Sequence, residues 1–352
     1  MREYIALDVH KYYSLLEREA IDDRQYRQIR VNHKRGAIRS SLNRIEPGTA
    51  VAVEATGNWY WIVEEIEQAG GMPQLVHPRK AKLMMGLINK TDKLDVHGLN
   101  RLQRNGTLPT VWIPPGPLRD LRELTRTRMV LVGIRTRLKN RILSTLSKYA
   151  LGLDEEASDP FGVKARRRMR ELIKRLPEQT QRVTEELLGL LEEVEQQAAQ
   201  EESRLGALLK VTPEMELIKT MPGVGLILAA VIALEIGDIG RFASAERLAS
   251  YSGTVPRIKA SGDKVRYGQL RSDVNRYLKW AFMEAANIIC IQRRREPQRH
   301  VSQLYERIAG RKGHPKAIGA VARHLAEACF YVLSRRESYR DPSLRLRQSI
   351  GT

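Results

Sequence analysis

The segment Pro114-Pro115-Gly116-Pro117 divides this chain of 352 residues into two parts with different hydrophobic patterns. Proline and glycine interrupt helices and strands, so such a run marks a boundary between folding units. Before it, short apolar runs of strand length alternate with helical patterns, and after it apolar residues recur mainly at helical spacing. The sequence therefore predicts an α/β unit over residues 1–115, followed by all-α structure.

In the first part, the expected elements are short and of mixed type. Apolar runs and β-branched residues predict four strands, and spacings of three and four residues predict two helices that end near glycine or asparagine. The strands are expected at residues 4–9, 25–31, 50–54 and 73–76, and the helices at 58–69 and 91–105. This order predicts a sheet with both parallel and antiparallel neighbours.

In the second part, the first pattern is that of a coiled-coil arm over residues 116–210. Leu124, Leu131 and Leu138 recur at seven residues in a basic stretch, and an acidic stretch follows. Two long helices joined by a loop near residues 151–162 fit this pattern. The arm is either a solvated hairpin with a structural charge pattern or a dimerising element that follows a phosphate backbone. In the second case the contacts would come from Arg126, Arg135, Arg137 and Arg141.

Residues 211–334 predict a separate helical domain. The turn Met221-Pro222-Gly223-Val224-Gly225 opens an apolar helix and resembles a helix-hairpin-helix element, whose amides can meet a phosphate. A glycine-rich basic loop is expected over residues 253–268, before a helix at 275–291. The basic tail, residues 335–352, has little periodicity and is expected to be disordered.

The balance of charge excludes several classes of protein. Sixty Lys and Arg against 41 Asp and Glu give a net charge of +19, which favours a polyanionic partner. No stretch approaches about 18 consecutive apolar residues, so no membrane span is expected, and the first residues lack the apolar core of a signal peptide. Cys290 and Cys329 are too few for a disulfide framework or a four-cysteine zinc site. We expect a cytoplasmic, nucleoid-associated protein that binds nucleic acid.

Four carboxylates are placed where they could form one site. Asp8 and Glu54 each stand near the end of a predicted strand, and Asp92 and Asp95 are three residues apart in a predicted helix, hence on one face. A helix across the sheet would bring that face to the strand ends. Crowded carboxylates repel unless a hard cation lies between them, and Mg²⁺ takes oxygen ligands. The structural alternative is that these residues stabilise turns and the helix N-terminus.

Several segments together resemble a known family, the DEDD transposases of the IS110 and IS1111 insertion sequences, whose relatives include pilin-gene invertases. The KTDxxDA signature is specific, and here Val96 replaces its alanine. The resemblance covers roughly residues 3–335. The N-terminal segments that carry it are Tyr4-Ile5-Ala6-Leu7-Asp8-Val9-His10-Lys11, Val53-Glu54-Ala55-Thr56-Gly57-Asn58-Trp59 and Lys90-Thr91-Asp92-Lys93-Leu94-Asp95. The C-terminal segments include Met221-Pro222-Gly223-Val224-Gly225, Glu235-Ile236-Gly237-Asp238, Tyr251-Ser252-Gly253 and Val255-Pro256-Arg257.

The resemblance implies an RNase H-like (RuvC-like) N-terminal domain with Asp8, Glu54, Asp92 and Asp95 as Mg²⁺ ligands. It also implies a serine nucleophile, which falls on Ser261. Implied partners are double-stranded donor and target DNA and a structured noncoding guide (bridge) RNA that pairs with both. A composite site, with the carboxylates of one protomer facing the serine of another, implies a homo-oligomer, expected to be a tetramer.

The residues around Ser261 suit this chemistry without proving it. A hydroxyl needs activation and a stabilised transition state, and cations that could bind phosphate are Arg257, Lys259, Lys264 and Arg266. Ser252 is the rival nucleophile, although its setting is typical of a turn at a helix end. His10 and His97 are interpreted as neighbours of the carboxylates rather than ligands.

Two other functions stay open at this point. The first is a metal-dependent resolvase or nuclease that uses water, or a site-specific DNA invertase. The second is a nucleic-acid-binding protein without catalysis. The metal-dependent cleavage of DNA strands and a covalent protein–DNA adduct would discriminate among them.

Overall fold

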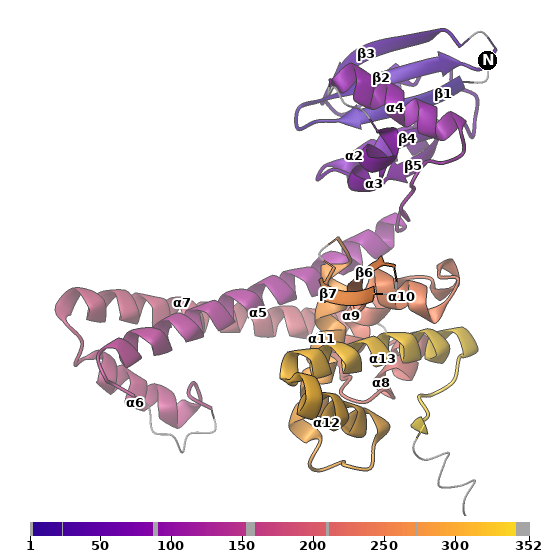
Figure 1. The fold of residues 1–352 in the computed structure, drawn as a ribbon. Helices are drawn as coiled ribbons and strands as arrows, with labels where there is room; N and C mark the ends of the chain where they lie inside the picture. Colours follow the sequence, from indigo (N-terminus) through magenta and orange to yellow (C-terminus); the bar gives the residue numbers. More distant parts are fainter. Residues whose placement is uncertain are drawn as a thin grey trace, which may run out of the picture. The chain divides into compact units, whose positions relative to one another are not determined.

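A computed structural model describes residues 3–22, 24–86, 91–152, 159–208, 211–262, 264–271 and 273–342. The chain forms two compact units, Met1–Pro114 and Pro115–Thr352, so the boundary lies at the predicted proline run. Figure 1 shows the elements of both units. Within the described ranges, no helix combines the length and the hydropathy that crossing a membrane requires.

The first unit is built on one five-stranded sheet with the order β3-β2-β1-β4-β5. Strand β1 pairs antiparallel with β2 and parallel with β4, β2 pairs antiparallel with β3, and β4 pairs parallel with β5. The strands are β1 (Glu3–Val9), β2 (Tyr13–Ala20), β3 (Tyr26–Asn32), β4 (Ala50–Glu54) and β5 (Met72–Val76). The helices are α1 (Ala37–Ser41), α2 (Trp59–Gln68), α3 (Pro78–Met85) and α4 (Asp92–Arg104).

The two faces of this sheet are covered by different helices. Because side chains alternate along a strand, Ile5 and Leu7 point to the face covered by α1 and α2, where they pack with Ile38 and Ile62. Ala6 points to the other face, where α3 and α4 pack. The sheet therefore lies between two helical layers, and even-numbered residues of β1 face α4.

The second unit contains the long helices and a small hairpin. Its elements are α5 (Gly116–Lys148), α6 (Val163–Ile173), α7 (Glu178–Leu208), α8 (Pro213–Lys219), α9 (Leu226–Ile236), η1 (Ile239–Arg241), α10 (Ala245–Tyr251), β6 (Pro256–Ser261), β7 (Lys264–Leu270), α11 (Arg276–Gln292), α12 (His300–Lys312) and α13 (His314–Arg335). Figure 1 shows α5 and α7 running side by side with α6 beside them. The prediction of two arm helices missed α6.

The arm and the helical domain are joined through Glu235, a fully buried residue of α9. Arg126 of α5 binds this carboxylate through two nitrogens at 2.8 and 3.1 Å, and Asn275 donates to it at 2.8 Å. Arg122 of α5 donates to the carbonyl oxygens of Leu234 and Glu235. The start of α5 is therefore part of the domain predicted to begin at residue 211.

The turn before α9 is fixed by close packing. Gly223 has a positive φ of 73°, and a Cβ there would lie 2.4 Å from the carbonyl oxygen of Ala285 in α11. Only glycine fits such a position. The helix pair α8–α9 has the order expected of a helix-hairpin-helix element. Within the fold, however, Gly223 is needed because the backbone of this turn packs closely against the backbone of α11.

Two segments of the second unit differ from the sequence-based prediction. The loop expected over residues 253–268 contains the paired strands β6 and β7. The expected disordered tail begins within α13, and its described part is attached to the domain: the Tyr339 amide donates to Thr220 Oγ1 at 2.8 Å, and Asp341 accepts from the His300 amide. Residues 343–352 lie outside the described ranges.

Candidate functional site

The ends of two parallel strands place Asp8 and Glu54 next to each other. Leu7 of β1 pairs with Val53 of β4, so the two acids that follow are at the same level of the sheet. Two residues before each acid stands an alanine, Ala6 or Ala52, that points to the face covered by α4. Because side chains alternate along a strand, both acids point to the same face. The sequence predicted this convergence, because parallel strands end at the same edge.

Helix α4 brings the second pair of carboxylates. The Thr91 hydroxyl accepts from the Leu94 amide at 3.3 Å and caps the helix, and Asp92 and Asp95 lie in its first turn. Negative charge is stabilised there by the helix dipole. Below them, Val96 and Leu99 are buried against the sheet and hold the first turn beside the strand ends. Lys90, which begins the signature segment, lies outside the described residues.

A cavity of about 410 Å³ opens where these elements meet. It is lined by Asp8, Glu54 and Asp95, and by the cations Arg79 and Lys82 of α3. Asp92 joins the same group from the other side, because it shares His10 with Asp8. All four predicted carboxylates are therefore brought together around Asp8, next to cations that could neutralise a phosphate.

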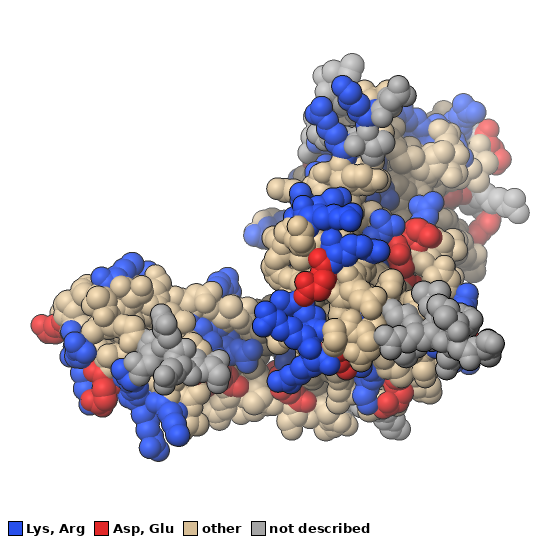
Figure 2. All heavy atoms as spheres, turned by 60° about the horizontal axis from the view of Figure 1, so that its bottom comes forward, with Lys and Arg blue, Asp and Glu red and all other residues tan. Residues whose placement is uncertain are grey.

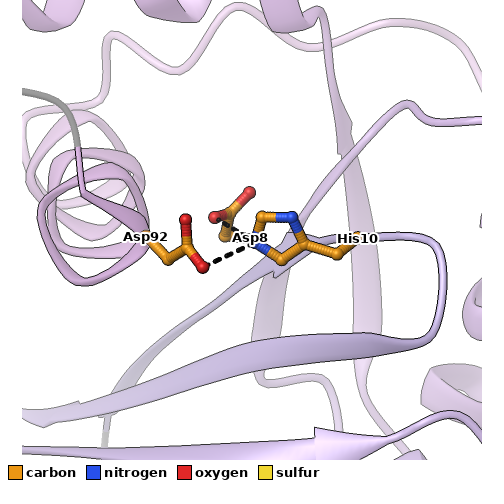
Figure 3. Close-up of side chains that lie close together, drawn as sticks. All are labelled: Asp8, His10 and Asp92. Atoms are coloured by element: carbon orange, nitrogen blue, oxygen red, sulfur yellow. Dashed lines mark ion pairs between the residues drawn. The ribbon is translucent and has the colours of Figure 1, made fainter.

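His10 has a larger part in this group than the sequence suggested. Its Nε2 lies 3.2 Å from Asp8 Oδ2 and 3.3 Å from Asp92 Oδ2, so the ring stands between the two carboxylates (Figure 3). It also stacks on Tyr13, whose hydroxyl donates to Asp92 at 2.8 Å. His10 is thus a neighbour of the carboxylates, as the sequence suggested, and it contacts two of them directly.

The electrostatics of Asp8 are those of a crowded buried acid. Burial raises the pKa of Asp8, and the nearby charges of Asp95 and Asp92 raise it further. His10 and a hydrogen bond with Glu54 act in the opposite direction, but the pKa stays above its ordinary value. The charged form of Asp8 is thus less favourable than that of a carboxyl in water, and an added positive charge would stabilise it.

The donors at this point suit a hard divalent cation. Ligand atoms of Asp8, His10 and Asp92 all lie within 4.8 Å of one another. Asp8 Oδ2 and His10 Nε2 are shielded from water, and within the described part of the chain neither makes a hydrogen bond. The two atoms lie 3.2 Å from each other, and a cation beside Asp8 would neutralise the carboxylates that crowd it.

A second carboxylate group lies under α4, and the protein itself satisfies most of it. Glu17 of β2 is fully buried and accepts from Gln28 at 2.6 Å and Asn100 at 2.9 Å, while His97 Nδ1 lies 3.0 Å from it. The buried Glu19 pairs with Arg104. His97 therefore belongs to this second group.

Ser261 is the last residue of β6 and pairs with Lys264 across the tip of the hairpin. It is exposed, as are Arg257, Lys264 and Arg266, and Gly262 at the turn has a positive φ of 56°. The side chain of Lys259 lies outside the described part of the structure. The hairpin therefore presents a hydroxyl beside cations, as the nucleophile hypothesis requires.

Ser252, the rival nucleophile, is fully buried at the end of α10. Its hydroxyl donates to the Ala249 carbonyl oxygen at 2.9 Å. This is the turn at a helix end that the sequence suggested, and a buried hydroxyl held in that way cannot reach DNA.

The arginines predicted to follow a phosphate backbone fall into two groups. Arg126 is held by Glu235 inside the second unit, so its guanidinium is already engaged by the protein. Arg137 and Arg141 are exposed on α5 and Arg135 is partly exposed. Other cations of the arm, among them Arg128 and Lys139, pair with glutamates of α7, so part of the charge pattern is structural. Figure 2 shows Lys and Arg gathered in patches on one face of the molecule.

Comparison with known proteins gives matches along most of the chain. A model of the DEDD transposases of IS110 matches residues 6–151, and one described as the "Transposase IS116/IS110/IS902 family" matches residues 215–303. A "Probable family 20 transposase" of Pseudomonas aeruginosa is 23% identical over 96% of this chain and 98% of its own length. A "Transposase for insertion sequence element IS1111A" of Coxiella burnetii is 25% identical over 87% and 83%.

Proposed function

Because this chain is a DNA transposase of the IS110 insertion-sequence family, we propose that it cuts and rejoins DNA through a phosphoester bond between Ser261 and a DNA phosphate. The observation that carries the proposal is the exposure of Ser261 at the tip of a cationic hairpin, while Ser252 is buried. Such a bond would conserve the energy of the cleaved phosphoester, so that strands could be rejoined without ATP.

The first unit would supply the metal centre. Its strand order and the helices on both faces support an RNase H-like domain. Asp8, Glu54, Asp92 and Asp95 would hold Mg²⁺, which polarises phosphoryl oxygens and stabilises the charge that develops on them. His10 would orient the carboxylates of Asp8 and Asp92, and Arg79 and Lys82 would bind the DNA phosphate on either side of the reacting one.

Around Ser261, the chain itself would provide the remaining groups. The exposed Lys264 and Arg266 would hold the non-bridging phosphate oxygens, and Gly262 would permit the backbone to approach the DNA closely. As the Ser261 oxygen forms its bond to phosphorus, the hydroxyl proton would pass to water. The bond from phosphorus to the 3′ or 5′ oxygen of the neighbouring nucleotide would break, and that oxygen would take a proton from water. Reversal of this step by a second strand would rejoin the DNA.

The family resemblance adds a guide and a partner to the proposal. A structured noncoding RNA would pair with donor and target DNA and thereby choose the sequence, and a net charge of +19 suits two polyanions. Carboxylates of one protomer would face Ser261 of another, in a tetramer. The recovery of one RNA species with the purified protein, and its mass in solution, would test these two parts.

The decisive experiment is a search for the adduct. Wild-type protein incubated with Mg²⁺, the RNA of the element and DNA spanning an element end should yield a denaturant-resistant protein–DNA adduct. Ser261→Ala should abolish it and still bind DNA, since the cations remain. Loss of a hydroxyl from an exposed position should change the free energy of unfolding by about 0.5 kcal/mol or less.

Ser252→Ala is the control and should still form the adduct. An adduct that disappears with Ser252→Ala and persists with Ser261→Ala would reverse the assignment. Strand cleavage without an adduct in either variant or the wild type would favour a resolvase that uses water.

A further inference from the structure

The hairpin that carries Ser261 has two chemically different faces. Side chains directly opposite each other in an antiparallel pair share a face, and neighbours along a strand alternate. Ser261 pairs with Lys264, and Arg266 lies two residues further along β7, so these three share one face. Ile258 pairs with Tyr267 and both belong to the opposite face. The hydroxyl thus lies on a cationic face, and an apolar pair lies behind it.

This apolar pair is open to solvent. The Ile258 and Tyr267 residues are 58% and 70% exposed. A large aromatic residue and a β-branched residue together on a projecting ribbon form a surface of the kind that binds a partner.

The position of the pair on the ribbon indicates what the partner is. Ile258 stands three strand residues from Ser261, or about 10 Å along the strand. Three base steps at about 3.4 Å each span the same length of a DNA strand. A ribbon whose serine is at a phosphate therefore places Tyr267 beside bases a few nucleotides away. Aromatic side chains bind bases by stacking whatever their sequence, and apolar side chains enter between base steps as wedges.

The two faces cannot both lie against one undistorted strand. With Ser261, Lys264 and Arg266 turned to the phosphate of the strand to be cut, Ile258 and Tyr267 point away from it. A two-stranded ribbon is small enough to enter the major groove. The apolar face would then meet the opposing strand, and bases become accessible to it only if they are unstacked.

We propose that Ile258 and Tyr267 form a wedge that stacks on an unpaired DNA base and holds the two strands apart beside the phosphate that Ser261 attacks. The inference rests on the proposed function, because it takes the position of the cut from Ser261. It assigns the apolar face a separate task, which is to open the duplex so that strands can be exchanged.

The test compares two DNA substrates. One is a fully paired duplex spanning the junction between the element and its flanking DNA, and the other has the same sequence with a run of mismatches at that junction. Each carries 2-aminopurine beside the cleavage position, whose fluorescence rises when the base unstacks. The full-length chain is used with the RNA of the element and Mg²⁺, and adduct formation is followed in parallel.

The double variant Ile258→Ser/Tyr267→Ser should form the adduct about ten- to a hundredfold more slowly on paired DNA, because the cost of unstacking is no longer offset. The mismatched duplex should restore its rate to near that of the wild type. The fluorescence rise on paired DNA should be absent. Tyr267→Phe keeps the stacking ring and should behave as the wild type, and Ile291→Ser, at another exposed apolar position of the same unit, should change neither readout.

Three results would overturn the wedge. These are equal losses of rate on both substrates, an unchanged fluorescence rise in the double variant, or a changed oligomeric state with no rescue by mismatches, which would make the face a contact between copies of the chain. Ser261→Ala separates the two proposals, because it should lose the adduct and keep the fluorescence rise. A wild-type protein that opens DNA without an adduct would refute the serine mechanism and leave the wedge supported.

Discussion

The two carboxylate groups under α4 differ in what neutralises them. Glu19 is paired with a guanidinium, and Glu17 is bound by two amides and by His97. In the group around Asp8, His10 lies between two of the acids and Tyr13 donates to Asp92, and the group borders a cavity of about 410 Å³. Both groups lie on the same face of one sheet and contact the same helix. Buried charge is therefore common to both groups, and the cavity beside the acids distinguishes the group around Asp8 as the candidate site.

The comparison is tested most strongly by removing one charge from each group. Asp8→Asn should lower the rate of Mg²⁺-dependent strand cleavage about a thousandfold, because metal stabilisation of the transition state is worth several kcal/mol. Glu17→Gln keeps the shape of its side chain and should cleave at nearly the wild-type rate. Gel assays of strand cleavage with equal amounts of folded protein measure both. Equal rates for wild type and Asp8→Asn would refute the metal centre.

The second group should matter for folding instead. Arg104→Met leaves the buried Glu19 without its cation and should lower the free energy of unfolding by about 3–5 kcal/mol. Urea unfolding is followed by tryptophan fluorescence in a Trp280→Phe background, in which the remaining tryptophans, Trp59, Trp61 and Trp112, all belong to the first unit.

Two controls make this result specific to a buried pair. Arg182→Met breaks an exposed ion pair with Glu186 and should cost less than about 1 kcal/mol. Adding Glu19→Leu to Arg104→Met should recover most of the loss, since an apolar pair can replace a buried ionic one. A double variant as unstable as Arg104→Met would mean that packing, and not charge, holds α4 there.

Mg²⁺ should raise the free energy of unfolding by binding to the group around Asp8, and it should not bind to the group around Glu17. At a Mg²⁺ concentration about a hundred times its dissociation constant, the free energy of unfolding should rise by about 2.7 kcal/mol, and EDTA should reverse the rise. Asp92→Asn should reduce this effect and Glu17→Gln should retain it. Thermal unfolding with and without Mg²⁺ measures the shift, and a shift lost only with Glu17→Gln would move the metal to the second group.

The smallest expected effect is on pH dependence in the absence of metal. Burial raises the pKa of Asp8 in the folded chain above 3.8, its usual value, which applies to the unfolded chain. At a pH between the unfolded and the folded pKa, the folded chain therefore binds more protons than the unfolded one. Stability from this group therefore falls as the pH rises through that window. In EDTA, Asp8→Asn should be more stable than the wild type at neutral pH, and the difference should shrink towards pH 3.8. A difference that grows on acidification would contradict the raised pKa.

Much of the first group could be predicted from the sequence, because short-range patterns define it. Parallel strands that each end in an acid must bring these acids together, and the spacing of Asp92 and Asp95 puts both on one helix face. His10 could not be predicted in the same way. Its position depends on the turn between β1 and β2, which places its ring over Tyr13.

Sequence patterns could not predict the group around Glu17 or the hairpin of β6 and β7. Strand β2 was not predicted, because its charged residues Glu17 and Glu19 are atypical of a buried strand. They are satisfied by Gln28 of β3 and by residues of α4 about 80 positions away. The strands around Ser261 have no face in the core, so they lack the alternation of buried and exposed residues that reveals a strand. A loop was the natural expectation there.

The anchoring of α5 has a practical consequence for dividing the protein. A fragment that began near residue 211, where the sequence suggested a domain start, would lack Arg122 and Arg126 and would keep Glu235 buried in its core. Such a fragment should be insoluble or poorly folded when expressed. A cut at Pro114 would keep the acid with both its arginines, so the second unit is best produced from residue 115 onward.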